Sequence, residues 1–136
     1  MAIYTLLYAS RALVTGEGAE AAVQDIVRGS RARNAGLGIT GALLFSGGHF
    51  AQWLEGDRAG VDELMRSIAR DPRHTDIVIL EAGAAPVRRF PDWTLAYAGS
   101  STFVDSTLAD ALGERSADRA RRAGRILSLL EEFAAL

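Results

Sequence analysis

Apolar and polar positions at the start of the chain predict a strand and then a helix. Residues 2–9, "AIYTLLYA", alternate and are rich in β-forming side chains, so they predict a strand with Leu6 and Tyr8 on one face. In residues 19–33, apolar or small side chains recur at the spacing of one helical face, with charges between them. The sequence "NAGLG" at residues 34–38 is expected to end this helix.

A hairpin, a second helix and two further strands follow. Two apolar runs in residues 39–56 are joined at "SGG", which is a hairpin signal. Asp57 is a candidate N-cap of a helix that Pro72 stops, and the apolar residues between them recur at helical spacing. Residues 76–83, "DIVILEAG", and residues 93–99, "WTLAYAG", are typical of strands.

The order of these elements predicts an α+β fold of the ferredoxin-like type, βαββαββ. Right-handed crossovers would give a five-stranded mixed sheet with two helices on one face and the first and third strands adjacent at its centre. In the third strand, alternation places Gln52 on one face and Trp53 and Glu55 on the other. If Gln52 and Tyr8 both face the helices, they meet in the core. Each group of the Gln52 amide buried without a partner costs about 1 to 3 kcal/mol, so this amide needs partners.

The pattern changes after Gly99 to two helical segments, at residues 105–113 and 116–136. The sheet face opposite the paired helices would otherwise lie bare, so we expect these C-terminal helices to cover it or to contact a partner. The chain therefore divides into a domain of residues 1–99 and a C-terminal helical extension of residues 100–136. The second segment carries an apolar stripe at Ile126, Leu129, Leu130 and Phe133.

Composition excludes several classes of protein. The 136 residues carry a net charge of -2, which gives no electrostatic footprint for nucleic acid. No apolar run approaches the length of a membrane span and the N-terminus has no signal core, so we expect a cytoplasmic protein without membrane contacts. The absence of cysteine and lysine excludes thiolate and Schiff-base catalysis. The two histidines are isolated and indicate no metal site.

Several motifs occur in an order that resembles one known family. Tyr8, Asn34, "GITGALL", Gln52 with "LEG", "DPRH" and "RRFPDW" together resemble the BLUF family of blue-light sensors that use FAD, over residues 1–99. The resemblance implies a flavin, FAD with FMN as a second possibility, between the two helices and edge-on to the sheet. Tyr8 is similar to the photochemical tyrosine of the family, and Gln52 to the glutamine that bridges it to the flavin.

The resemblance implies further site residues. Asn34 corresponds to an asparagine that holds the flavin carbonyl edge, and Ile26 and Ile68 correspond to apolar walls against the two faces of the ring. Trp93 and Leu95 correspond to positions in strand five that take part in switching and output. The other cofactor-binding candidates, all on the two helices, are Ser30, Arg66 and Arg70.

Three positions depart from the family pattern. Leu95 stands where members usually carry methionine. Arg33 replaces a second asparagine that some members show just before the matched one. Ser67 occupies a position on helix two that is often arginine or histidine beside the flavin tail.

By this resemblance the chain is a blue-light photoreceptor and not an enzyme. Light would drive an electron and then a proton from Tyr8 to the flavin, with Gln52 as the relay. The Gln52 amide would return rotated or tautomerised, and its altered hydrogen bond would shift the flavin absorption to the red. The signal would pass through strand five and the C-terminal helices to an unidentified downstream protein, and we also expect a homo-oligomer.

Two other functions fit parts of the pattern. Small ferredoxin-like domains can hydrolyse acyl phosphates with an arginine and an asparagine, and the chain has both residue types. That chemistry requires a phosphate-binding loop after strand one, where "SRALVTGEG" is not rich in glycine. The other alternative is a protein-interaction module that keeps the fold without a flavin. The colour of the purified protein separates these possibilities.

Overall fold

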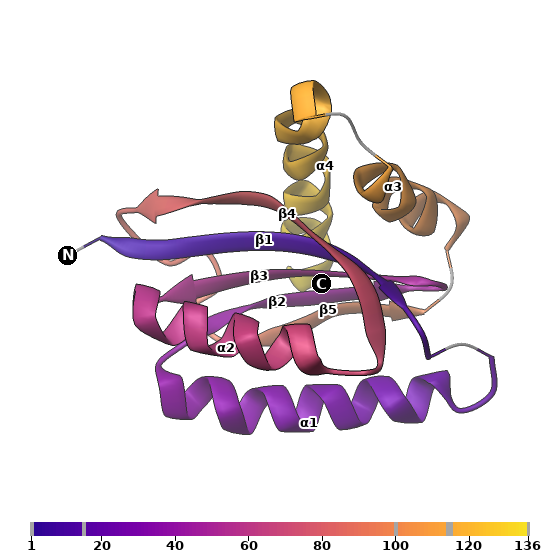
Figure 1. Ribbon diagram of the computed structural model, residues 1–136, viewed down its shortest axis with the longest axis horizontal. Coiled ribbons are helices and arrows are strands. Elements are labelled where there is room, and N and C mark those ends of the chain that lie inside the picture. The colour runs from indigo at the N-terminus through magenta and orange to yellow at the C-terminus, as the bar shows by residue number, and fades with distance from the viewer. Residues whose placement is uncertain (1, 15, 100, 114–115, 136) are drawn as a thin grey trace.

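A five-stranded sheet forms the centre of the molecule, with two helices on each face (Figure 1). The computed structural model describes residues 2–14, 16–99, 101–113 and 116–135. The helices α1 and α2 lie on one face of the sheet, and α3 and α4 lie on the other. This confirms the predicted α+β ferredoxin-like arrangement with C-terminal helices on the second face. None of the helices in the described ranges is long and apolar enough to cross a membrane.

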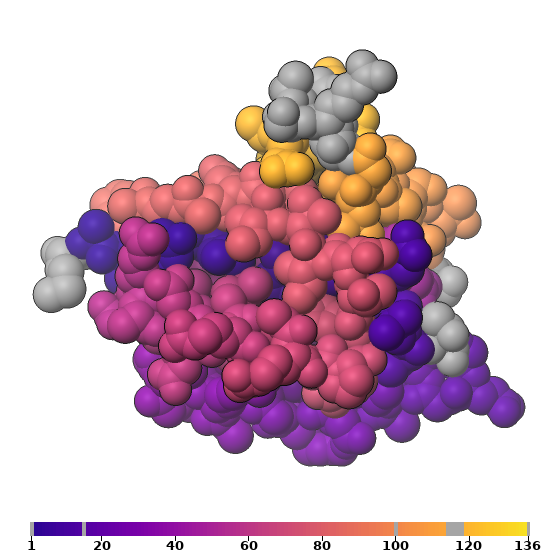
Figure 2. Space-filling model, viewed as in Figure 1, coloured from indigo at the N-terminus to yellow at the C-terminus, as the bar shows by residue number. Residues whose placement is uncertain are grey.

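The strand order is β4-β1-β3-β2-β5, so β1 and β3 are neighbours at the centre, as predicted. β5 pairs in parallel with β2, and the other neighbouring strands are antiparallel. In the space-filling view, residues of α2 and β4 make up much of the visible face, and α3 and α4 project above it (Figure 2). The strands are β1 (Ile3–Ala12), β2 (Thr40–Ser46), β3 (His49–Gly56), β4 (His74–Ala85) and β5 (Thr94–Gly99).

The first helix continues beyond its predicted end. "NAGLG" was expected to break it, but α1 includes Asn34 and Gly36 and ends at Leu37. The terminating residue is Gly38, whose left-handed backbone, with φ 68°, costs glycine little and turns the chain into β2. Asn34 therefore lies in the last turn of α1 and not after it. The helices are α1 (Ala19–Leu37), α2 (Arg58–Arg70), α3 (Thr102–Leu112) and α4 (Ser116–Ala134).

One row of the sheet carries the polar pair predicted from alternation. Tyr8 of β1 is opposite Gln52 of β3, Gln52 is opposite Leu43 of β2, and Leu43 is opposite Leu95 of β5. Opposed residues point to the same face of a sheet. Tyr8 packs with the apolar residues of α2, and Leu43 packs with those of α1. The row therefore faces the two helices.

The opposite face packs against the C-terminal helices. Ala51 and Trp53 of β3 belong to one apolar cluster with Leu108 of α3 and Leu130 of α4. The predicted apolar stripe of α4 is thus used within the chain and does not offer an exposed face to a partner. At the C-terminal end of this stripe, the centroid of the Phe133 ring lies 4.8 Å from the centroid of the Tyr97 ring of β5.

A buried carboxylate fixes the connection between β4 and β5. The side chain of Glu55 is 0% exposed and accepts four hydrogen bonds. Its Oε1 accepts from the Trp53 indole N–H at 2.9 Å and from the Arg89 backbone N–H at 2.8 Å. Its Oε2 accepts from the Thr40 hydroxyl and from the Phe90 backbone N–H, each at 2.9 Å. The two backbone donors lie in the β4–β5 connection, so Glu55 holds that segment against β3.

Two arginines extend this connection to the helices. Arg88 donates to the Gly38 carbonyl at 3.0 Å and to the Glu55 carbonyl at 3.1 Å, which ties the segment to the end of α1. Arg89 pairs with Glu131 of α4 at 3.0 Å. The segment before β5 is therefore in contact with both layers of helices.

Replacing Glu55 should destabilise the fold through its hydrogen bonds. In Glu55→Gln an amide N–H₂ would face two of the four donors, and each buried donor left without an acceptor costs about 1 to 3 kcal/mol. We expect the free energy of unfolding, measured by urea denaturation, to fall by at least that amount. Glu81→Gln, at an exposed position of β4, is the matched control and should leave it nearly unchanged. Equal stability of the two variants would contradict a structural role for Glu55.

Candidate functional site

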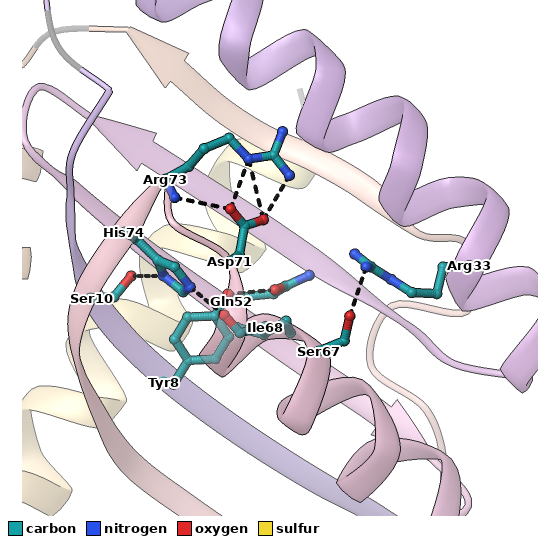
Figure 3. Close-up of polar contacts among 9 residues, drawn as sticks. All are labelled: Tyr8, Ser10, Arg33, Gln52, Ser67, Ile68, Asp71, Arg73 and His74. Atoms are coloured by element: carbon teal, nitrogen blue, oxygen red, sulfur yellow. Dashed lines mark hydrogen bonds and ion pairs between the residues drawn. The ribbon is translucent and has the colours of Figure 1, made fainter.

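Tyr8 and Gln52 form a buried hydrogen bond beneath the two helices. Their side chains are 3% and 4% exposed. The Tyr8 hydroxyl donates to Gln52 Oε1 at 2.7 Å, across 44 positions of sequence (Figure 3). The pairing of the central strands β1 and β3 sets this contact, because it places the two residues directly opposite each other.

The amide nitrogen of Gln52 remains available. It points away from Tyr8 in Figure 3, and no group among the described residues accepts a hydrogen bond from it. Gln52 also lines a small cavity between α1 and α2. A ligand in this cavity that carries hydrogen-bond acceptors would satisfy the free N–H₂ group.

The cavity has apolar walls and a polar rim. Ile26 of α1 and Ile68 of α2 come from opposite helices, and Leu43 and Phe50 come from the sheet beneath. Its volume is about 30 Å³, so a ring system can enter only if side chains of the two helices move apart. The polar side chains that line it are Tyr8, Ser30, Arg33, Gln52, Asp71, Arg73 and His74.

The environment of Tyr8 keeps its phenol neutral. Burial raises the pKa of Tyr8 well above the usual value for tyrosine, and the negative charge of Asp71 raises it further. The positive charge of Arg33 acts in the opposite direction but does not cancel the effect. The hydroxyl therefore carries its proton at neutral pH and can act as a donor to Gln52.

His74 ties the strand that carries Tyr8 to the end of α2. The Ile68 carbonyl can only accept, so His74 Nε2 donates to it, at 2.7 Å (Figure 3). His74 Nδ1 then accepts from the Ser10 hydroxyl, also at 2.7 Å. Both ring nitrogens are satisfied, so His74 supports one wall of the cavity.

Asp71 and Arg73 form a two-point ion pair at the rim. Arg73 Nη2 lies 2.6 Å from Asp71 Oδ2, and Arg73 Nε lies 2.9 Å from Asp71 Oδ1. This pairing holds the pKa of Asp71 below its usual range, chiefly through the hydrogen bonds from the Arg73 side chain. Across the cavity, Arg33 of α1 donates to the Ser67 hydroxyl of α2 at 3.1 Å.

Asn34 is held by Trp93 and Ser30. Asn34 is 1% exposed, in the last turn of α1. In the amide orientation that satisfies both of its atoms, Asn34 accepts from the Trp93 indole N–H at 2.8 Å and donates to the Ser30 carbonyl at 3.1 Å. One amide hydrogen and one oxygen lone pair remain for a ligand. Trp93 immediately precedes β5, so this strand is joined to α1 beside the cavity.

The structure brings together some of the residues named from the sequence. The cavity is lined by Tyr8, Gln52, Ile26, Ser30 and Ile68. Asn34 and Trp93 lie next to it through Ser30, and Leu95 shares the sheet row of Gln52 with Leu43 between them. Arg66 and Arg70 are exposed on α2 and do not line the cavity. The roles of all these residues toward a flavin stay predictions.

Other lining residues had not been named as site residues. Strand alternation could have identified Phe50, because it shares the face of Gln52 two residues away. Asp71, Arg73 and His74 belong to "DPRH", a motif that carried the family resemblance without an assigned role. Within the described ranges, no group of three histidine or acidic side chains could hold a metal ion.

Comparison with known proteins shows a family likeness. The profile described as "BLUF: Sensors of blue-light using FAD" matches residues 3–96. The chain is 44% identical over 68 residues to the blue light- and temperature-regulated antirepressor BluF of Escherichia coli (strain K12), covering 50% of this chain and 17% of the relative. It is 40% identical over 95 residues to the photoactivated adenylate cyclase subunit beta of Euglena longa, covering 69% of this chain and 11% of the relative. The chain spans less than a fifth of the length of these two curated relatives.

Solved structures are similar over nearly the whole chain. The dark-state structure of BlrB, a BLUF protein, aligns with a TM-score of 0.70 and 33% identity, covering 99% of this chain and 98% of that one. The ground state of BlsA aligns with a TM-score of 0.74 and 26% identity, covering 95% of this chain and 87% of that one. Coverage of this extent includes the C-terminal helices α3 and α4.

Tyr8 should ionise at unusually high pH. In an ultraviolet titration, subtracting the Tyr8→Phe variant from the native chain isolates the phenolate signal of Tyr8. This signal should still be absent at about pH 10, the ordinary tyrosine value. Tyr8 has a higher pKa in the folded state than in the unfolded state. Its contribution to stability is therefore fully present below the unfolded-state pKa and is lost as the pH rises through the folded-state pKa. A difference signal with its midpoint near the ordinary value would show that Tyr8 is not desolvated.

Proposed function

The chain belongs to the BLUF family of blue-light sensors that use FAD, and on this basis we propose that it is a photoreceptor that binds a flavin between α1 and α2. The observation that carries the proposal is the Tyr8–Gln52 hydrogen bond, with the Gln52 amide nitrogen left available in the cavity. This nitrogen can donate to the acceptor atoms of a ligand in the cavity. FAD and FMN share the ring that would lie there, so either could fill the site.

The chemical character of the cavity residues suits such a ring. The flavin edge at N5 and the neighbouring carbonyl accepts hydrogen bonds, which matches the free N–H₂ group of Gln52. Ile26 and Ile68 provide apolar surfaces from opposite helices. Arg33–Ser67 is the one hydrogen bond between α1 and α2 within the described ranges, so separating the two helices breaks no other hydrogen bond between them. The free amide hydrogen and lone pair of Asn34 would serve the carbonyl edge of the ring.

The chain's own residues support a switch based on the Gln52 amide. When bound, the flavin supplies absorption of blue light and an excited state that accepts an electron and a proton. Tyr8 is a buried, neutral phenol that can give both, and its proton lies on the hydrogen bond to Gln52 Oε1. The Tyr8 hydroxyl can donate or accept, so both orientations of the Gln52 amide keep a hydrogen bond to it. The two orientations differ at the other end, where either N–H₂ or C=O would face the flavin.

Output through β5 has a physical basis in the contacts of that strand. Trp93 joins the start of β5 to Asn34, which in turn contacts Ser30 of the cavity lining. Tyr97 of β5 packs against Phe133 of α4. We propose that a change at the site alters these contacts and is read by a downstream protein or a second copy of the chain. The antirepressor and cyclase activities in the names of the relatives belong to those proteins and do not identify this partner.

A sensor role is favoured over the two alternatives. The hydrolase would require a phosphate-binding loop after β1, and residues 10–18, "SRALVTGEG", are not rich in glycine. For a flavin-free interaction module, the available donor of Gln52 would have no use. A light-minus-dark absorption spectrum of the purified chain tests the proposal. A yellow preparation with a reversible red shift supports it, and a colourless preparation that takes up no flavin contradicts it.

Removing either polar partner should abolish the red shift and retain the flavin. We expect Tyr8→Phe and Gln52→Leu to bind flavin through the apolar walls but to show no light-induced shift. Tyr8→Phe should also lower stability by about 1 kcal/mol through the lost hydrogen bond. The matched control is Tyr4→Phe, on the same strand and the same face but outside the cavity lining, which should keep the shift. A normal shift in either site variant would rule out this mechanism.

Asn34 and Trp93 should act on flavin binding as one unit. Trp93→Phe removes the indole donor that orients the Asn34 amide, at a cost of about 1 kcal/mol, or roughly fivefold in the flavin Kd. Asn34→Ala should weaken binding by more, because it removes the direct contact as well. The double variant should bind flavin as Asn34→Ala does, since both changes remove the same hydrogen bond. Strictly additive effects in a fluorescence titration would show that Trp93 does not act through Asn34.

A further inference from the structure

Arg33 carries the positive charge at the cavity rim that no carboxylate neutralises. Two arginines line the cavity, Arg33 and Arg73. The guanidinium of Arg73 is paired at two points with Asp71. Arg33 contacts the hydroxyl of Ser67, a neutral group, at 3.1 Å. None of the ion pairs within the described ranges includes Arg33.

The position of Arg33 places its guanidinium over the gap between the two helices. It follows Ser30 by one turn of α1 and reaches across to α2 (Figure 3). Arg33 is exposed overall, but its charge still acts on the buried Tyr8 hydroxyl, where it partly opposes the rise in the pKa caused by burial and by Asp71. The guanidinium therefore lies at the rim of the cavity, between the two helices and exposed to solvent.

The other arginines of α1 are engaged elsewhere. Arg28 pairs with Asp25 on the same helix. The guanidinium of Arg31 lies over the Trp93 ring, 6.0 Å from its centroid. Neither residue lines the cavity. Arg33 is the cation that α1 presents to a ligand there.

We propose that Arg33 binds a phosphate group of the flavin tail, so that the chain prefers phosphorylated flavins to riboflavin. The proposal rests on the proposed function, because it requires the flavin ring in the cavity. A guanidinium offers paired N–H donors that match phosphate oxygens, and its bond to a neutral hydroxyl is readily exchanged for a charged partner. The Ser67 hydroxyl, once released, can donate to the same phosphate.

The test compares FMN with riboflavin, which differ by one phosphate. Each flavin is titrated into the full chain freed of bound flavin, and binding is followed by quenching of flavin fluorescence. We expect FMN to bind roughly fivefold more tightly than riboflavin at low salt, the size of an exposed ion pair. The difference should shrink at high salt, because screening weakens exposed charge pairs.

Matched variants assign the preference to Arg33. Arg33→Gln should bind riboflavin as the native chain does and lose the preference for FMN. Arg28→Gln, at an exposed position of α1 outside the cavity lining, should keep it. The double variant Arg33→Gln with Ser67→Arg returns a guanidinium to the same gap from the other helix and should restore the preference.

The outcomes separate this proposal from the one on which it rests. Equal Kd values for FMN and riboflavin in the native chain overturn the role of Arg33 alone. A preference for FMN that survives in Arg33→Gln overturns it as well. If neither flavin binds the native chain, the proposed function fails and the role of Arg33 fails with it.

Discussion

The arrangement of the chain around its site depends on the four hydrogen bonds that the buried carboxylate of Glu55 accepts. A carboxylate without exposure to water must have hydrogen-bond donors, because leaving it unpaired in the core is prohibitively costly. Two of its four donors are backbone N–H groups between β4 and β5, so these two hydrogen bonds hold this segment against Glu55. Trp93 follows the segment directly and reaches Asn34 from there. The position of a proposed flavin ligand is thus linked to a carboxylate on the other face of the sheet.

β3 joins the site and the scaffold because its residues alternate between two occupied faces. Gln52 points toward the helices α1 and α2 and pairs with Tyr8. Trp53 points to the opposite face, packs against α3 and α4, and donates to Glu55. Arg89, which also donates to Glu55, continues the contact to Glu131 of α4. The backbone that positions the Gln52 amide therefore also positions the C-terminal helices, and neither face can shift independently of the other.

Two departures from the family pattern become a single feature in the structure. Arg33 and Ser67 are 34 positions apart in sequence, yet their side chains are hydrogen-bonded across the gap between α1 and α2. Arg33 supplies a positive charge at the cavity rim, and Ser67 supplies a small neutral hydroxyl. Within the part of the chain that the structure describes, none of the ion pairs includes Arg33.

Much of the fold could be predicted because strand alternation is a local property. Successive side chains of a strand point to opposite faces whatever the partner strand is, so the faces of Tyr8 and Gln52 followed from the sequence. Element order and crossover handedness then placed β1 beside β3. The end of α1 was misplaced because "NAGL" can continue a helix and the stop signal is Gly38. Helix boundaries are set by such single residues and are the least secure part of a pattern.

The sequence by itself determined the strands, their faces, the apolar stripe of α4 and the meeting of Tyr8 with Gln52. Tertiary structure alone decided which long polar side chains complete it. Arg33 and Arg73, and not Arg66 or Arg70, line the cavity, and Trp93 binds Asn34. The donors to Glu55 likewise come from up to 35 positions away. Periodicity fixes only the direction in which a side chain leaves the backbone, whereas the end of a flexible arginine is placed by groups that packing brings near.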